Sequence, residues 1–328
     1  MGLSVGWTDT VGQQFMDYIV GFLKVTPSLY KYFQSNGLIR NLGDGIDKIN
    51  YLEAKPVDGG QMASSIHKHN IITPEWEEIK VSFLYLNSLI RLSRQDVDKF
   101  RNGQRLSGDL IQDTMNMVIP TMVNQIDQFC AWGDRMKDSL TALDSYRNTD
   151  TFTGLFNSGT TIGGGALGGD DMTTLGDYRY TAGNMRNALR SAAHEMNQYM
   201  LLSDLNTSLE ADIGANHQYV NVGISEYQRV MEKKYIKNWM DSDNFIDSGE
   251  TKYRMAMIAP KQINPTPIGG KGISNNFELL VGYPFRVMPV YGGQMDVDKY
   301  FNWAITWSGA FVVYKDTAIQ HTGDLTLT

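Results

Sequence analysis

The longest stretch of regular hydrophobic spacing in the chain runs from Ser107 to Met136. Apolar residues recur there at intervals of three and four, which places them on one face of a helix: Ile111, Met115, Val118, Met122, Ile126 and Phe129. A continuous helix would be ~40 Å long at 1.5 Å per residue, long enough to act as the spine of a domain. Pro120 predicts a kink or two consecutive helices, and Gly133 predicts the C-terminal end.

The residues before this helix predict an arm and a ribbon. Residues 1–45 alternate short apolar patches with Gly, Ser and Asn, which is typical of an arm that leans on something else. Strand-like runs follow, and because neither face of the first run is strongly apolar, we expect a two-stranded ribbon with two polar faces and no core of its own. The Asp58-Gly59-Gly60 turn would form its tip. The alternating run Ile79, Val81, Phe83 and Tyr85 predicts a return to a sheet.

The second half of the chain predicts alternating helices and strands, and therefore an α+β fold class. The glycine-rich residues 151–176 predict a loop, and helical spacing predicts a helix over Asn184–Leu209 with Met200 and Leu201 on its apolar face. A strand over Tyr219–Val222 precedes Ser225, which is expected to cap a helix over Glu226–Lys234.

Late apolar runs predict further strands. A strand over Tyr253–Ile258 is followed by an expected loop over residues 260–276. Phe277–Val290 predicts one strand, whereas Tyr300–Gln320 predicts two strands or one bent strand interrupted at Ser308-Gly309.

Composition narrows the function classes. A formal net charge of −7 disfavours a dedicated nucleic-acid binder, although it leaves incidental contact with nucleic acid open. Cys130 is the only cysteine, so no intrachain disulfide is possible and a buried structural thiol is expected. No apolar run of membrane-spanning length and no signal-peptide pattern occurs, which predicts an intracellular product without membrane contact.

Each short motif that resembles a chemical site is better explained otherwise. Gly163–Gly168 matches a dinucleotide fingerprint but opens onto two aspartates instead of a helix, so a loop is expected. His67 and His69 have no supporting ligand in sequence, and His194-Glu195 lacks the second histidine of a zinc-protease motif. The aspartates at 241, 243 and 247 lack the bidentate glutamate of a calcium loop. The sequence therefore predicts no catalytic, cofactor-binding or metal-binding residues and no cofactor.

Five stretches carry a resemblance to a known family. They are Glu77–Val81 through Leu92–Val97, Ile126–Phe129 with Trp132-Gly133-Asp134, Tyr219–Val222 with Glu226–Lys234, Val281–Val287, and Phe311–Ile319. In order and spacing they resemble the major capsid proteins of the Hong Kong 97-like fold, which tailed viruses of bacteria and archaea use for icosahedral heads.

That resemblance implies an architecture. The expected parts are an N-terminal arm (residues 1–45), an extended β-hairpin loop (46–84), a peripheral domain with its spine helix at about 107–136 (85–180), an axial domain (181–283), and return strands to the peripheral domain (284–328).

The resemblance also implies a function. The chain would be a structural protein, not an enzyme, that self-assembles through pentamers and hexamers into a virion shell in the host cytoplasm. Its expected partners are itself, portal and scaffolding or decoration proteins, and packaged double-stranded DNA without sequence-specific contacts. One alternative is an encapsulin-type cellular compartment, and a weaker one is a nucleotide-binding enzyme that uses the Gly163–Gly168 loop.

Overall fold

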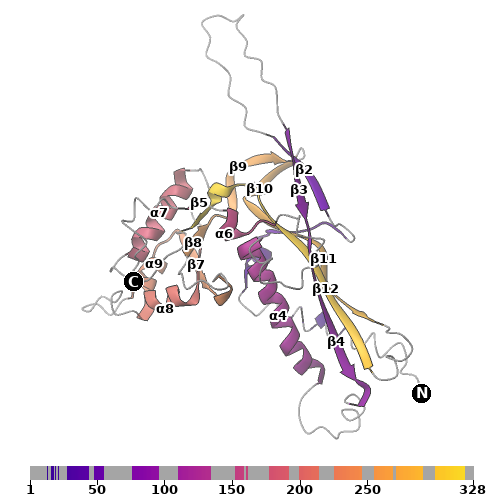
Figure 1. Ribbon diagram of the computed structural model, residues 1–328. Helices are drawn as coiled ribbons and strands as arrows, with labels where there is room; N and C mark the ends of the chain where they lie inside the picture. Colours follow the sequence, from indigo (N-terminus) through magenta and orange to yellow (C-terminus); the bar gives the residue numbers. More distant parts are fainter. Residues whose placement is uncertain are drawn as a thin grey trace, which may run out of the picture.

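The described part of the molecule contains two four-stranded sheets, one five-stranded sheet, one helix of 23 residues and several shorter helices (Figure 1). The computed structural model describes residues 13, 16–17, 19, 21, 28–43, 48–54, 76–95, 110–133, 152–158, 160–161, 177–191, 199–213, 225–245, 255–268, 271–290 and 300–321. The mixture of helix and mainly antiparallel sheet confirms the predicted α+β class.

Sheet A is the central sheet, with strand order β1-β11-β12-β4. Its two longest strands, β11 (Phe277–Pro289) and β12 (Tyr300–Val313), pair antiparallel, and β4 (Leu84–Ser93) pairs with the other edge of β12. Both late strands were predicted. However, β12 continues through Ser308-Gly309, and the irregular register lies in β11 between Val281 and Arg286. The short β13 (Ile319–His321) follows a 3-10 turn, η5 (Asp316–Ala318).

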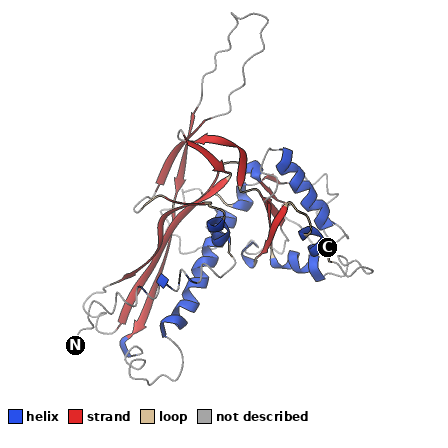
Figure 2. Ribbon diagram, turned by 180° about the vertical axis from the view of Figure 1, so that it is seen from behind, coloured by secondary structure: helices blue, strands red, loops and turns tan. Residues whose placement is uncertain are grey.

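The spine helix is confirmed as α4 (Leu110–Trp132), which lies along one face of sheet A (Figures 1 and 2). It is a single helix through Pro120, so of the two predicted alternatives, a kink or two consecutive helices, the second is excluded. Thr121 donates from Oγ1 to the carbonyl of Met117, one turn earlier, at 3.1 Å. One face of the helix is buried and belongs to the same hydrophobic cluster as Trp303, Ile305 and Trp307 of β12. The residues of that helix face are Met115, Ile119, Met122, Val123, Ile126, Phe129 and Cys130.

Two glycines end the spine where another segment crosses it. Gly133 has φ +52°, in the left-handed region that favours glycine. A Cβ on Gly133 would lie 2.5 Å from the carbonyl carbon of Thr153, and one on Gly154 would lie 2.5 Å from the Gly133 nitrogen. The crossing segment continues into α6 (Leu155–Ser158) and β5 (Thr160–Thr161), so the prediction of a loop over residues 151–176 is wrong for these residues.

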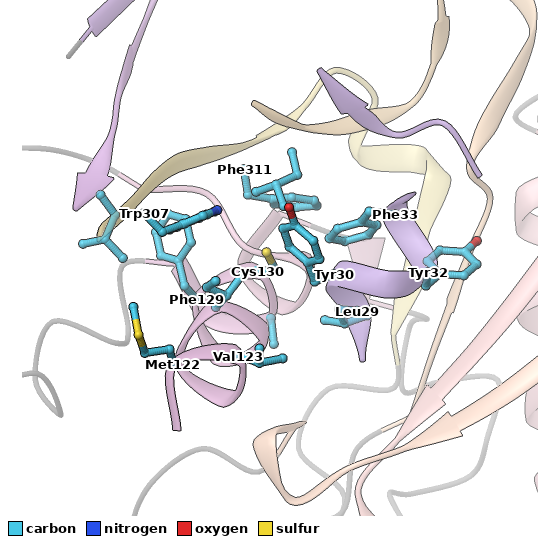
Figure 3. Close-up of a cluster of buried hydrophobic side chains, with 14 of the residues drawn as sticks. Leu29, Tyr30, Tyr32, Phe33, Met122, Val123, Phe129, Cys130, Trp307 and Phe311 are labelled. Carbon is cyan, nitrogen blue, oxygen red and sulfur yellow. The ribbon is translucent and has the colours of Figure 1, made fainter. Parts of the chain in front are cut away.

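The second half of the predicted arm is part of the chain's own core. The helix α2 (Leu29–Ser35) packs on α4 (Figure 3), and β1 (Ile39–Asn41) pairs parallel with β11. Phe33 is fully buried and stacks on Phe311 with ring centroids 5.5 Å apart. The expectation of an arm without intrachain support is therefore wrong for residues 28–43, because its aromatic residues fill the gap between the spine and sheet A.

The predicted ribbon exists, but one of its faces is apolar at the root. β2 (Lys48–Ala54) and β3 (Trp76–Ser82) pair antiparallel, and the register sets Ile49 opposite Val81 and Tyr51 opposite Ile79, with Glu53 opposite Glu77 farther along the same face. Residues directly opposite share a face of the sheet, so the expectation of two polar faces is wrong at the ribbon's root. Ile49 and Val81 pack on a buried cluster at the ribbon's root that contains Phe83, Leu280, Ala310, Val312 and Tyr314.

The ribbon also belongs to a larger sheet, sheet B, with strand order β10-β9-β2-β3. β9 (Lys261–Ile268) and β10 (Lys271–Asn275) form a hairpin where the sequence predicted a loop over residues 260–276. Proline and glycine in this segment indicate a loop when the sequence is considered alone. Pro267 nevertheless lies in β9, opposite Gly272 of β10. A proline is tolerated in a strand where its position does not need to donate a backbone hydrogen bond.

Sheet C forms a separate layer covered by three helices, with strand order β5-β13-β8-β6-β7. The helices are α7 (Asp177–Ser191), α8 (Leu205–Ile213) and α9 (Glu226–Met231), and the remaining strands are β6 (Tyr199–Ser203), β7 (Ile236–Asp241) and β8 (Met255–Ile258). The predicted helix over Asn184–Leu209 is wrong at Met200 and Leu201, which lie in β6. Every residue of β6 is buried, so its sequence lacks the alternation of apolar and polar residues that would distinguish a strand from a buried helix.

Smaller predictions in this layer are confirmed. Ser225 caps α9 with a full capping box, in which its Oγ accepts from the backbone N–H of Gln228 and the Gln228 side chain accepts from the Ser225 N–H. The strand expected over Tyr253–Ile258 is β8, and the helix expected over Glu226–Lys234 is α9, whose Val230 is buried. The strand predicted over Tyr219–Val222 lies outside the described residues.

Candidate assembly surfaces

The described residues include no group of three or more metal-ligating side chains. The motifs Gly163–Gly168, His67 with His69, and His194-Glu195 lie outside the part of the chain that the structure describes. Asp241, from the rejected calcium pattern, accepts a hydrogen bond from the hydroxyl of Ser208. None of the described helices has the length and apolarity needed to cross a bilayer.

A buried carboxylate joins the N-terminal segment to the spine. Asp127 of α4 is 4% exposed, and its two oxygens accept from the backbone N–H groups of Leu29 (3.1 Å) and Tyr30 (3.2 Å) at the start of α2. Ser28 completes the cap by accepting from the Lys31 N–H. A carboxylate at a helix N-terminus satisfies donors that have no partner within the helix.

Burial dominates the electrostatics at this junction. Removal from water raises the pKa of Asp127 to about 7, and the two backbone donors oppose that rise only in part. The same burial, with the Asp127 carboxylate nearby, raises the pKa of the Cys130 thiol well above its ordinary value. Cys130 is completely buried, as the sequence predicted, and is a structural thiol.

A second polar junction ties the three sheets together. The buried Glu278 of β11 forms an ion pair with Arg40 (3.3 Å) and accepts hydrogen bonds from Tyr314 Oη (3.1 Å) and Asn275 Nδ2 (2.9 Å). Next to it, Asn276 donates from Nδ2 to the Ala259 carbonyl at 2.8 Å, and its own carbonyl accepts from the N–H of Tyr314. These contacts connect sheet A to β10 of sheet B and to Ala259, the residue that follows β8 of sheet C, at one point.

One face of sheet A carries exposed apolar side chains at the end away from the ribbon. Opposite the α4 side, the register aligns Leu89 (55% exposed), Ala304 and Met288 (48% exposed) across the three strands. The next rows set Arg91 beside Asn302 and Arg286 beside Thr306. We call these seven residues the outer face of sheet A.

Sequence reasoning did not single out this outer face or the two polar junctions. Asp127 looked like one polar residue on a helix, and its partners lie almost a hundred positions earlier in the chain. The alternating run predicted from the sequence ends at Tyr85, and the pairing that brings Leu89 into line with Met288 depends on β12 between them. Only the assembled sheet shows these surfaces.

Solved structures with the same architecture are capsids and related shells. The capsid protein of Myoviridae phage XM1 superposes with a TM-score of 0.54 at 12% identity, over 88% of this chain and 90% of that one. A chain of Microbacterium phage Oxtober96 gives 0.55 at 9% identity over 90% of each chain. A virus-like particle from Pyrococcus furiosus gives 0.53 at 9% identity, over 94% of this chain and 98% of that one.

The chain has the fold of viral capsid proteins. The predicted resemblance to the Hong Kong 97-like capsid family is thus confirmed at the level of the fold. No protein-family model matches the sequence, and no curated protein sequence matches it significantly. At 9–12% sequence identity, the similarity to these structures concerns the fold of the backbone.

Proposed function

We propose that this protein is the shell-forming subunit of the icosahedral head of a tailed virus, and that the shell encloses double-stranded DNA. The observation that carries the proposal is the agreement of nearly the whole chain with phage capsid proteins, 88% of this chain against 90% of the XM1 protein. A match of that extent spans most of the subunit and is not confined to one shared motif.

In this proposal, each segment of the chain has a role in building the shell. Residues 1–45 serve as arm, 46–84 as extended loop, 85–180 as peripheral domain with the spine, 181–283 as axial domain, and 284–328 as return strands. The ribbon β2–β3 leaves the subunit at one end of sheet A (Figure 1) and lies across a neighbour, which buries the apolar surface that one chain alone leaves exposed. The glycine at 43, with φ +99°, lies between β1 and β2 and lets the chain turn into the ribbon.

The remaining partners follow from this proposal. Copies of the chain form pentamers and hexamers, with portal and scaffolding or decoration proteins as further partners. The net charge of −7 fits a container that holds DNA without sequence-specific contacts. The protein is then a component of the virion, assembled in the host cytoplasm.

The decisive experiment is assembly of the purified chain. Electron microscopy and sedimentation are expected to show closed particles of uniform size. A stable monomer across salt and protein concentration, with or without co-expressed scaffolding protein, would contradict the proposal.

A second experiment tests the ribbon. Residues 55–75 connect the last paired positions of the ribbon, Ala54 and Trp76, so an Asn-Gly turn can replace them without disturbing the register below. The shortened subunit is expected to fold with an unchanged unfolding midpoint but to form no closed shell. The matched control extends the same segment by a Gly-Ser pair. Normal particles from the shortened subunit would refute a role for the ribbon in assembly.

An encapsulin-type compartment is the second candidate, because the Pyrococcus furiosus particle covers 94% of this chain. The contents of the shell separate the two. Nuclease-protected double-stranded DNA supports the virus, whereas a co-purifying cargo protein in DNA-free particles supports the compartment. The third candidate, a nucleotide-binding enzyme acting through Gly163–Gly168, requires saturable nucleotide binding by the purified chain.

A further inference from the structure

The segment from Ser28 to Gly43, which we call the strap, is held by partners far along the chain. Asp127 of the spine accepts from its first backbone N–H groups, Lys237 of β7 donates to Asn36 Oδ1 at 3.2 Å, and β1 pairs with β11. Because β1 is the edge strand of sheet A, the pairing of β11, β12 and β4 does not depend on the strap. Release of the strap therefore leaves the other three strands of this sheet paired.

Apolar burial holds the strap in place at every pH. Leu29, Phe33 and Leu38 are fully buried. The ring of Phe33 meets that of Phe277 edge-on, with centroids 6.0 Å apart. These contacts involve no charge, so their contribution does not change with protonation. Any pH dependence of strap docking must come from a charged group beneath it.

The charged group beneath the strap is the carboxyl of Asp127, which is 4% exposed and accepts from the N–H groups of Leu29 and Tyr30. An ionised carboxylate loses its hydration on burial, and two backbone donors replace only part of that hydration. Burial consequently raises the pKa of Asp127 to about 7. Protonation thus stabilises the docked strap, and ionisation weakens it.

The described titratable groups that face Asp127 are neutral near pH 7. They are Cys130 of α4 and Tyr30 of α2, and burial raises the pKa of both groups. Lys31, the cation of α2, is partly exposed, and the pKa of Asp127 is set by burial and the two N–H donors. The residues that sheet A, α6 and η4 (Asp243–Phe245) contribute to the surrounding hydrophobic cluster are uncharged.

We propose that the strap is a pH-sensitive latch, which stays docked on the spine while Asp127 is protonated and opens more readily once this carboxyl ionises. Release returns the carboxylate to water and uncovers the edge of β11, where unpaired backbone groups can pair with another chain. The latch therefore controls whether a subunit presents a free strand edge. The inference concerns the single subunit and stands independently of the proposed shell function.

The direction and size of the pH effect follow from two protonation equilibria. The released strap leaves Asp127 ionised from about pH 4 upward, whereas the docked strap keeps it protonated to about pH 7. The equilibrium constant for release therefore rises between these two pH values and stays constant above them. From pH 5 to pH 8 the expected increase is roughly a hundredfold.

Cys130 reports on release without any change to the sequence. It is the only cysteine, it is completely buried, and its sulfur lies beside the ring of Tyr30 in the strap (Figure 3). A disulfide reagent such as dithiodipyridine should label it only when the strap opens or the whole subunit unfolds. Its protection is the labelling rate in the unfolded chain divided by that in the folded subunit at the same pH. This ratio removes the pH dependence of the thiol's own reactivity.

In unassembled parent subunits, the protection of Cys130 is expected to fall by roughly a hundredfold from pH 5 to pH 8. At each pH it should also be smaller than global unfolding alone allows, because the strap opens while the rest of the subunit stays folded. Denaturant unfolding at the same pH supplies the global value. Equal protection at both pH values, or protection equal to the global value, would overturn the latch.

Two variants separate the charge from the packing. Asp127→Asn cannot ionise, so its protection should change by less than about threefold over the same pH range. Phe33→Ala removes a fully buried ring of the strap, so it should lower protection by a similar factor at both pH values and keep the pH dependence. The matched control is Asp113→Asn, which removes an exposed carboxylate from the first turn of α4 and should behave as the parent does.

Hydrogen exchange gives a second readout at the strap itself. At pH 8, backbone amides of residues 28–43 should exchange before those of β12, and simultaneous exchange would show that the strap does not open separately. An Asp127→Asn subunit with the parent's pH dependence would also overturn the assignment to Asp127. If that variant does not fold, the parent protection and its comparison with Asp113→Asn decide the question. None of these measurements requires particles, so a failed latch leaves the shell function standing, and the reverse holds too.

Discussion

The two faces of sheet A are covered by different means. The face toward α4 is closed by the chain itself, with Trp303, Ile305 and Trp307 all at most 1% exposed. The opposite face is covered near the ribbon's root by the cluster around Phe83 and Val312, whereas Leu89 and Met288 farther along it are exposed. A single subunit thus buries its core on one side and leaves apolar side chains in water on the other. Under the proposed shell function, substitutions on the two faces should act on different equilibria, folding on one and assembly on the other.

The largest expected effect is on the covered face. Trp307→Ala removes a fully buried indole that packs against Phe285 of β11. Loss of a buried tryptophan typically costs about 3–5 kcal/mol in the free energy of unfolding. Denaturant unfolding of unassembled subunits measures it. A loss below ~1 kcal/mol would show that α4 and sheet A are less tightly packed than their burial indicates.

The next effect concerns the end of the spine. Gly133→Ala adds a methyl group 2.5 Å from a backbone carbon at a residue with φ +52°, so both contact and backbone conformation oppose it. The expected loss is about 2–4 kcal/mol, since backbone cannot move aside as a flexible side chain would. Gly183→Ala is the matched control, because nothing lies within 4 Å of a Cβ added in α7. The comparison of the two unfolding midpoints decides the matter.

The Asp127 junction gives a pH effect on the covered face. Since burial raises the folded-state pKa of Asp127 to about 7, above an unfolded value near 4, the folded chain binds the proton more tightly. The stabilising contribution is therefore complete below pH ~4 and is lost as the pH rises to ~7. Between pH 5 and 8 this group is expected to remove about 2–3 kcal/mol from the free energy of unfolding.

The variant Asp127→Asn isolates that effect. It cannot ionise, so its unfolding free energy should change less with pH over the same interval than that of the parent. The asparagine side chain has one acceptor oxygen and one NH2 donor, so one of the N–H groups of Leu29 and Tyr30 then faces a donor and loses its hydrogen bond. The free energy of unfolding of the variant Asp127→Asn at pH 5 is therefore expected to be lower than that of the parent. Parallel pH profiles for parent and variant would mean that Asp127 does not titrate in this range.

The smallest expected effect on folding lies on the open face. Leu89→Ala should change the free energy of unfolding of the subunit by less than about 0.5 kcal/mol, because more than half of its side chain is already in water at 55% exposure. The same variant should reduce particle yield if this face is covered in the shell. A large loss of subunit stability would show instead that the chain itself covers Leu89.

Elements with local signals could be predicted from sequence. The spine followed from the spacing of apolar residues such as Met115 and Met122, and the start of α9 followed from Ser225 and its capping partner. Both signals involve residues within a few positions of each other, so they do not depend on how distant parts of the chain pack.

Predictions failed where burial comes from distant partners. Met200 and Leu201 are good helix formers in a strand buried on both faces, so propensity and tertiary packing conflict there and packing prevails. The ribbon appeared polar because each strand was considered alone. Pairing of β2 with β3 gathers Ile49, Tyr51, Ile79 and Val81 on one face, and no count along a single strand contains that register. The assembly surfaces have the same origin.

The placement of β13 has a consequence for synthesis. This strand, Ile319–His321, lies between β5 and β8 inside sheet C, and β12 just before it lies between β11 and β4 in sheet A. On the ribosome, sheets A and C therefore remain incomplete until β12 and β13 have been synthesised. The strands made earlier, among them β4, β6 and β8, keep unpaired edges until then, so both sheets close together and late in synthesis.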